Sequence, residues 1–225
     1  LLWTIIPAIV LAVIIIWGIT LWNEATSDPG KMRTVEVYSK QFNWIARYPG
    51  ADAKLGKHSY RFISGSNQIG LDSTDVHALD DQVVETEIHL PVNEEVNLVF
   101  RSQDVIHSAY LPHFRAQMNT VPGMRTNFHF KPTITTADMR KKEEVIEQIK
   151  DINAIRLAKQ EKPIEFDYWL ICNKICGSSH YKMKMKVVIE SKKDYEVWLA
   201  AQPNFGKGRE VTAPKTAAVA GEKPH

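Results

Sequence analysis

The chain opens with an uncharged apolar run, LLWTIIPAIVLAVIIIWGITLW, from Leu1 to Trp22. About 20 consecutive apolar residues in a helix are enough to cross the hydrocarbon core of a bilayer. Trp3 and Trp17 lie near the ends of the run, where indole side chains favour the interface between lipid and water. A secretory signal would instead have a basic start and a cleavage site of small residues. We therefore predict a transmembrane helix over residues 1–22, in contact with membrane lipid.

Short alternating segments dominate the chain after a polar linker at residues 23–34. Apolar and polar residues alternate with the period of a strand, and Gly, Pro, Asn and Asp mark the turns between the segments. The segments are TVEVYSKQFNWIARY, VVETEIHLPV, EVNLVFRS, DYWLICNKIC and MKMKVVIE. Many short strands with such turns are typical of an antiparallel sandwich or a Greek-key barrel. The pattern predicts one mainly β domain over residues 35–202.

One segment of this domain, residues 135–160, has a helical pattern instead. Val145, Ile149 and Ile152 recur at three and four residues, and Thr136 is a candidate cap for the start of the helix. We interpret the segment as a helical insertion at the rim of the sandwich. The stretch after residue 202 is rich in Ala, Lys, Gly and Pro and has no periodic apolar pattern, which predicts a disordered tail over residues 203–225.

Charge is distributed unevenly along the chain, although the formal net charge is only +2. So mild an excess of positive charge does not indicate a nucleic-acid-binding protein. Residues 71–100 hold eight acidic residues and no Lys or Arg, whereas residues 182–193 are strongly basic. This separation predicts distinct contact faces, and ordinary solvated surface is the alternative interpretation.

Both cysteines of the chain fall in the stretch CNKICGSSHYKM, from Cys172 to Met183. A thioredoxin-like redox site is excluded because it needs two residues between its cysteines and a βαβ unit. A disulfide between Cys172 and Cys176 is possible in an extracytoplasmic domain. A zinc site could use both thiolates and His180 with a fourth ligand, whereas copper would also make use of the soft thioether of Met183. The cysteines and the histidine alone leave copper, zinc and disulfide open.

A second stretch, SQDVIHSAYLPHFRAQMNTVPG, places His107 directly after a strand-like segment. Taken with the Cys-x3-Cys-x3-His-x2-Met pattern of the later stretch, it resembles subunit II of the haem–copper cytochrome c oxidases. LLWTIIPA is similar to the start of that subunit's second transmembrane helix, and KQFNW falls where the family has an aromatic motif. The resemblance extends over nearly the whole chain apart from the insertion and the tail.

The resemblance implies a cupredoxin-like Greek-key β-sandwich on an N-terminal transmembrane helix. It also implies a dinuclear copper centre, CuA, in which Cys172 and Cys176 bridge two copper ions. His107 and His180 would each bind one ion, Met183 would be a weak ligand to one, and the backbone carbonyl of Lys174 a weak ligand to the other.

The function implied is that of a membrane subunit which receives electrons for a respiratory terminal oxidase. It would take them from a cytochrome c, or from a membrane-bound cytochrome c complex, and pass them to haem in subunit I, which reduces oxygen. The copper domain would lie on the periplasmic or outer side of a respiratory membrane, and a first transmembrane helix would precede Leu1. The family commonly has Glu at the position of Lys174, where it helps to bind Mg²⁺. An ammonium group repels a divalent cation, so the resemblance does not carry a Mg²⁺ site over to this chain.

Electron uptake and docking are predicted to involve the aromatic motif and the acidic run. Phe42 stands where the family has a Trp that receives the electron, and Trp44 follows it. Acidic side chains would steer a basic cytochrome c towards the copper, and the effect would weaken as salt screens it. The docking residues that we predict are Phe42, Trp44, Asp80, Asp81 and Glu85.

Three other functions use parts of the same pattern. The copper domain of a nitrous oxide reductase carries the CuA motif, but the apolar run at residues 1–22 argues against it. Subunit II of a quinol oxidase has lost the cysteines and histidines, all of which this chain retains. A membrane anchor stabilised by zinc would need no redox chemistry at all.

Overall fold

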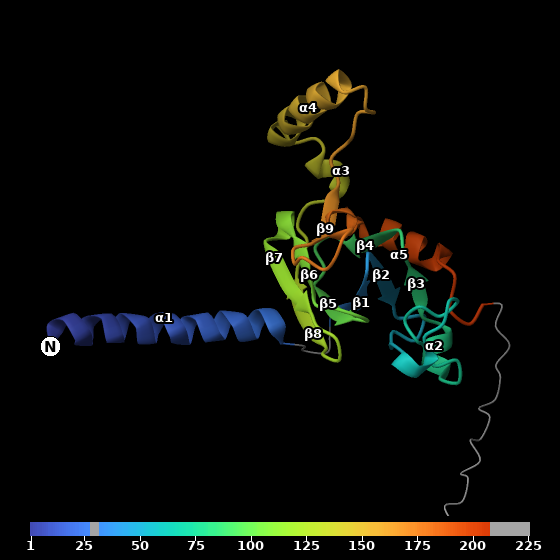
Figure 1. Ribbon diagram of the computed structural model, residues 1–225, viewed down its shortest axis with the longest axis horizontal. Coiled ribbons are helices and arrows are strands. Elements are labelled where there is room, and N and C mark those ends of the chain that lie inside the picture. The colour runs from blue at the N-terminus through green and yellow to red at the C-terminus, as the bar shows by residue number, and fades with distance from the viewer. Residues whose placement is uncertain (28–31, 208–225) are drawn as a thin grey trace, which may run out of the picture. The chain divides into compact units, whose positions relative to one another are not determined.

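The computed structural model describes residues 1–27 and 32–207. The chain divides into two compact units. The first unit comprises residues 1–48 and 84–202, and the second comprises residues 49–83 together with the segment that follows residue 202. Figure 1 shows the first unit as a β domain that carries helices at both ends of its chain and within it.

Two five-stranded sheets form the β domain. In the first sheet, the order is β3 (Gln82–Val84), β2 (Asn43–Tyr48), β1 (Arg33–Lys40), β5 (Val96–Ser102), β8 (Thr126–Phe130). In the second sheet, the order is β4 (Glu87–Pro91), β10 (Lys184–Glu190), β9 (Tyr168–Cys172), β6 (His107–Leu111), β7 (Ala116–Thr120). The mainly β fold that the sequence predicts is thereby confirmed.

Strand direction differs from the prediction of an antiparallel sandwich. β1 pairs with β5 in parallel, and β10 pairs with β4 in parallel, while the pairs β1–β2, β5–β8, β6–β7, β6–β9 and β9–β10 are antiparallel. A parallel pair needs a long connection between its strands, and more than fifty residues separate β1 from β5. Both sheets are therefore mixed. Period-two patterns indicate that strands exist, but they do not indicate which strands become neighbours.

The core consists of apolar side chains that alternate along these strands. Val35 and Val37 of β1, Leu98 of β5, Leu170 of β9 and Val187 of β10 are all buried in one apolar cluster. Successive residues of a strand point to opposite faces of its sheet, so Val35 and Val37, which are two apart in β1, lie on the same face. A close-packed core of this kind holds the loops at the strand ends in fixed positions.

The N-terminal helix α1 (Leu2–Thr26) has no buried residue. It continues four residues past the predicted end at Trp22, because Asn23, Glu24 and Ala25 do not interrupt a helix, and it stops with Ser27 in an extended conformation. In the part of the chain that the structure describes, α1 is the one helix long and apolar enough to cross a membrane. The rest of the predicted linker includes residues 28–31, which lie outside the described residues.

The insertion is helical, but it forms two helices instead of one. α3 (Thr136–Met139) and α4 (Glu143–Ala158) are separated by a break at residues 140–142. Arg140, at the break, donates to the Phe166 carbonyl at 2.8 Å and to the Asp167 carboxylate at 2.8 Å, which ties the insertion to its returning strand. Thr135 caps α3 instead of the predicted Thr136, whose buried hydroxyl accepts a hydrogen bond from the backbone of β10.

The second unit contains the short helices η1 (Tyr60–Phe62) and α2 (Val76–Leu79). The first residues of the predicted disordered tail belong to this unit, because Phe205 is buried and its N–H donates to the Asp81 carbonyl at 2.7 Å. The prediction of disorder is therefore wrong for residues 203–207, and the rest of the tail lies outside the described residues. Three further helices belong to the first unit: η2 (Pro112–Phe114), η3 (His180–Lys182) and α5 (Lys192–Ala201).

Candidate metal centre

Two neighbouring strands bring the predicted ligands together. His107 is the first residue of β6 and Cys172 is the last residue of β9, and these strands pair so that Ala109 lies opposite Cys172. The loop that follows Cys172 turns back at once, because the Cys172 N–H donates to the Met183 carbonyl at 3.0 Å. The loop from Cys172 to Met183 is therefore closed at its base beside the start of β6.

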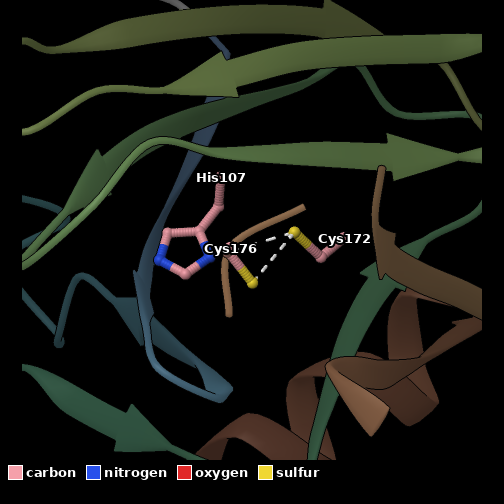
Figure 2. A group of neighbouring side chains, drawn as sticks. All are labelled: His107, Cys172 and Cys176. Carbon is pink, nitrogen blue, oxygen red and sulfur yellow. Dashed lines mark hydrogen bonds between the residues drawn. The ribbon is translucent and has the colours of Figure 1, made fainter. Parts of the chain in front are cut away.

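The two cysteine sulfurs lie 3.8 Å apart. A disulfide would need a separation of about 2.05 Å, so Cys172 and Cys176 are free thiols here. Metal–sulfur bonds are about 2.3 Å long, and two of them that meet at one ion span at most about 4.6 Å. The observed separation therefore suits two sulfurs that share the same metal. Figure 2 shows both sulfurs beside the imidazole ring of His107.

Each of the four other predicted ligands lies close to one of these sulfurs. Cys172 Sγ is 3.8 Å from His107 Nδ1 and 3.2 Å from the Lys174 carbonyl oxygen. Cys176 Sγ is 3.6 Å from His180 Nδ1 and 3.8 Å from Met183 Sδ. The structure thus gathers two sulfurs, two imidazole nitrogens, a thioether and a carbonyl into one cluster.

Burial defines the chemistry of this cluster. Both cysteines, His107 and Met183 are buried, and His180 is partly exposed. Burial, together with the neighbouring Cys172 thiol, raises the pKa of Cys176 to about 11, so this thiol carries its proton at neutral pH until a metal displaces it. A dry site with two sulfur ligands and a thioether favours a soft ion, and these donors fit copper better than zinc.

A carboxylate that sequence reasoning missed holds His107 in place. His107 Nε2 donates to Asp104 Oδ1 at 2.8 Å, which leaves Nδ1 directed towards Cys172. Burial alone would raise the pKa of Asp104, but hydrogen bonds from His107 and from the backbone of Gln41 and Val105 lower it overall. The carboxylate is therefore charged, and such outer partners fix the tautomer and the orientation of a ligating histidine. The only sign of this role in the sequence is that Asp104 lies three residues before the candidate ligand His107.

The turn between β1 and β2 contacts both loops that carry ligands. The Gln41 N–H donates to Asp104 at 2.6 Å, and the Gln41 side-chain amide donates to the Cys176 carbonyl at 2.6 Å. Phe42 lies against Gly177, where an added Cβ would stand 2.8 Å from the Phe42 ring. This turn consequently links the half-buried Phe42 to the cysteine loop and, through Asp104, to His107.

The predicted docking residues differ in their access to solvent. Phe42 and Asp80 are partly exposed, and Glu85 is exposed. Trp44 is buried, with its ring centre 6.2 Å from that of His107, and Asp81 is fully buried, where its carboxylate accepts from the Gly56 N–H at 3.1 Å. The prediction that Trp44 and Asp81 present their side chains to a partner is therefore wrong, since neither side chain reaches the surface.

Comparison with known proteins agrees with the resemblance seen in the sequence. Residues 33–138 match the family model for the periplasmic domain of cytochrome c oxidase subunit II. An alternative cytochrome c oxidase subunit 2 from Bradyrhizobium diazoefficiens is 34% identical over 189 residues, which cover 84% of this chain and 57% of the relative. A probable cytochrome c oxidase subunit 2 from Rickettsia felis is 27% identical over 201 residues, covering 89% of this chain and 52% of the relative.

The chain therefore spans little more than half the length of these two curated relatives. Among solved structures, the periplasmic domain of cytochrome oxidase subunit II from Bradyrhizobium japonicum aligns with a TM-score of 0.45 and 19% identity, over 74% of this chain and 90% of that one. The match to the family model ends before the cysteine loop, whereas the alignment with the Bradyrhizobium diazoefficiens relative covers most of the chain.

Proposed function

Because the chain belongs to the cytochrome c oxidase subunit II family, we propose that it is the subunit that receives electrons for a respiratory terminal oxidase. A dinuclear CuA centre in this chain would accept them from a cytochrome c or from a bound haem protein. It would pass them to haem in the catalytic subunit of the same complex, where oxygen is reduced to water. Proton translocation would likewise belong to the assembled complex.

One observation carries this proposal: four donor groups of the predicted kinds lie beside two sulfurs that are 3.8 Å apart. Cys172 and Cys176 would bridge the metals, and His107 and His180 would each complete the coordination on one side. When bound, such a centre takes up and releases single electrons shared between its two metals. A zinc site would have no use for the thioether of Met183.

The surrounding residues would keep this donor set rigid. Asp104 holds the imidazole of His107, and Gln41 holds the backbone of Cys176, so each ligand loop is fixed by a second contact. Burial of both cysteines keeps water away from the sulfurs. A site whose ligands move little between redox states has a small reorganisation energy, which favours electron transfer.

Location and partners follow from the helix α1 and the exposed edge of the centre. α1 would anchor the chain in a respiratory membrane, with the β domain on the periplasmic side and in contact with subunit I and other oxidase subunits. Phe42, partly exposed and in contact with the cysteine loop, is the proposed point of electron uptake. Lys174 contributes its carbonyl, while its ammonium group disfavours a Mg²⁺ ion at the same position.

Electron uptake by the purified full chain tests this function. The chain, loaded with copper in detergent, is mixed rapidly with a reduced cytochrome c, and the spectra of both proteins are followed. The proposal requires that the cytochrome is oxidised as the visible band of the copper centre bleaches, one electron for each centre. A chain that binds zinc and no copper, or a copper-loaded chain that leaves reduced c-type haem unchanged, would contradict it.

Isolation of the native complex separates the two remaining rivals. A subunit of a cytochrome c oxidase should copurify with a haem-bearing membrane subunit and with copper in this chain. Copurification with haem but without copper would favour a quinol oxidase, whereas reduction of nitrous oxide by the isolate would favour a nitrous oxide reductase.

A further inference from the structure

A groove of about 370 Å³ lies where the end of α1 meets the β domain. One wall is formed by Leu21, Glu24 and Ala25 of α1, which share a face of the helix because they are three and four residues apart. The opposite wall is formed by residues 129–131, at the end of β8, and by Glu95, which precedes β5. Both walls belong to the first unit of the chain.

Two hydrogen bonds join the walls of this groove. The Asn127 side-chain amide donates to the Thr26 carbonyl at 2.7 Å, and His129 Nε2 donates to the Glu24 carbonyl. Asn127 and His129 both belong to β8, so the end of α1 is held against one strand. The groove is therefore bounded by two elements that contact each other directly.

The sequence of α1 places this groove at the level of lipid headgroups. Leu21 and Trp22 end the apolar run, Asn23 and Glu24 follow it, and an indole such as that of Trp22 favours the interface between lipid and water. A helix rises about 1.5 Å per residue, so Glu24 stands about 3 Å beyond Trp22. The headgroup layer on each side of a bilayer is about 5 to 7 Å thick. In a membrane, Leu21 would therefore face acyl chains and Glu24 would face headgroups.

The polar side of the groove has charges of both signs. Val96 of β5 lies opposite Phe130 of β8, and Glu95 and Lys131 are the next residues of these two strands. Glu95 and Lys131 both line the groove, and both are exposed, as is Glu24. In the part of the chain that the structure describes, none of these three charged groups takes part in an ion pair. The groove thus offers one ammonium group and two carboxylates to a ligand.

We propose that this groove binds the headgroup of phosphatidylethanolamine. The lipid phosphate would accept hydrogen bonds from Lys131, the lipid ammonium would donate to Glu24 and Glu95, and an acyl chain would lie against Leu21. Phosphatidylcholine has no N–H group to donate, and phosphatidylglycerol would bring negative charge to the two carboxylates without a cation to offset it. This inference rests on the proposed crossing of a membrane by α1 and does not depend on the copper centre.

A lipid in this groove would contact both walls at once. Its ammonium would link Glu24 of α1 to Glu95 of the β domain, and its phosphate would add Lys131. Charges interact more strongly beside hydrocarbon than in bulk water, because the effective dielectric constant is lower there. The bound lipid would therefore strengthen the contact between α1 and β8 that the two hydrogen bonds establish.

Native mass spectrometry of the full chain in detergent measures the headgroup preference. The chain is titrated separately with phosphatidylethanolamine, phosphatidylcholine and phosphatidylglycerol of identical acyl chains, and the bound fraction gives an apparent Kd for each. Phosphatidylethanolamine should bind about three- to tenfold more tightly than the other two, which lies between the effect of an exposed ion pair and that of a hydrogen bond to a charged group. Equal binding of the three lipids, or a preference for phosphatidylglycerol, would overturn the proposal.

A change of charge at Lys131 tests the contact with the phosphate. Lys131→Glu should weaken the binding of phosphatidylethanolamine about tenfold, because it replaces a cation with a group that repels the phosphate. Lys159→Glu makes the same change at an exposed position at the end of α4 and should leave the affinity unchanged. Equal effects of the two substitutions would show that the lysine acts only through the net charge of the chain.

Loss of the two carboxylates tests the contact with the lipid ammonium. Glu24→Gln/Glu95→Gln should bring the affinities for phosphatidylethanolamine and phosphatidylcholine close together and should improve the binding of phosphatidylglycerol. Glu143→Gln/Glu144→Gln, at exposed positions in the first turn of α4, is the matched control and should keep the preference of the parent chain. An intact preference in the groove variant would refute the role of the carboxylates.

The same samples separate this inference from other outcomes. A dimer that Lys131→Glu abolishes would assign the groove to a second copy of the chain and overturn the lipid site. Failure of the chain to float with lipid vesicles would refute the anchorage by α1, and this inference with it. A copper-loaded chain without headgroup preference would refute the lipid site alone, whereas the predicted preference in a chain that binds no copper would support the lipid site and refute the copper centre.

Discussion

Replacement of Asp104 by asparagine should weaken copper binding without removing any ligand. Asp104 Oδ1 accepts from His107 Nε2 at 2.8 Å and from the Val105 N–H at 2.7 Å, and Oδ2 accepts from the Gln41 N–H at 2.6 Å. Asparagine keeps one acceptor oxygen and places an NH₂ group where the second oxygen was. One of these contacts then becomes a clash between two donors, and the negative charge beside His107 is lost.

The size of the effect follows from these contacts. Loss of an outer partner of a metal-bound histidine typically costs 10- to 100-fold in affinity, which corresponds to about 1.4 to 2.8 kcal/mol. A hydrogen bond to a charged group contributes about 1.5 to 3 kcal/mol, which is the same range. We therefore expect Asp104→Asn to bind copper about 10- to 100-fold more weakly than the parent chain.

Competition with a copper chelator of known affinity measures this change, and chemical denaturation of the metal-free variant measures any loss of stability separately. Asp138→Asn is the matched control, because this exposed carboxylate pairs with Thr135 and Lys141 in the insertion. Unchanged copper affinity in Asp104→Asn would refute the role of Asp104, and so would an equal loss in Asp138→Asn.

Three further substitutions test other parts of the site. Cys172→Ser should abolish the electronic signature of two equivalent coppers, because one bridging thiolate is lost, and its persistence in the paramagnetic resonance spectrum would contradict the bridging role. Met183→Leu should retain both coppers and shift the reduction potential, since a weak ligand tunes the site; complete copper loss would show that Met183 is needed to build it. Gly177→Ala should lower the free energy of unfolding by about 1 to 3 kcal/mol, because Gly177 has φ of +143° and its added Cβ would meet the Phe42 ring. Gly123→Ala, also at positive φ but with open space around it, should cost less, and an equal cost would rule out the contact with Phe42.

That the proposed ligands lie together could largely be predicted from the sequence, because most of them are local. Five of the six lie within twelve residues, and a loop closed between the paired strands β9 and β10 has little freedom to separate them. Placing His107 beside this loop needed the resemblance to a family, because sixty-five residues separate it from Cys172. The helix α1 and the insertion were equally accessible, since each has a distinct pattern of apolar residues.

Other features depend on contacts that no local pattern reports. Gln41 and Asp104 pair with each other across 63 residues of sequence, and nothing about either residue alone marks it as a partner of the other. Asp81 belongs to an acidic run that is typical of solvated surface, yet it is buried, and its carboxylate accepts from the Gly56 N–H. The break between α3 and α4 follows from the contacts of Arg140 with Phe166 and Asp167, which adjoin the insertion only in the folded chain.

Copper stoichiometry combined with electron paramagnetic resonance of the full chain tests the central claim most directly. The chain is purified in detergent, loaded with copper, oxidised, and analysed for metal content and for the hyperfine pattern. The proposed centre predicts two copper ions per chain and a pattern in which one unpaired electron is shared equally by two copper nuclei. A single copper ion with the pattern of an isolated nucleus, or a preference for zinc over copper, would contradict the dinuclear centre.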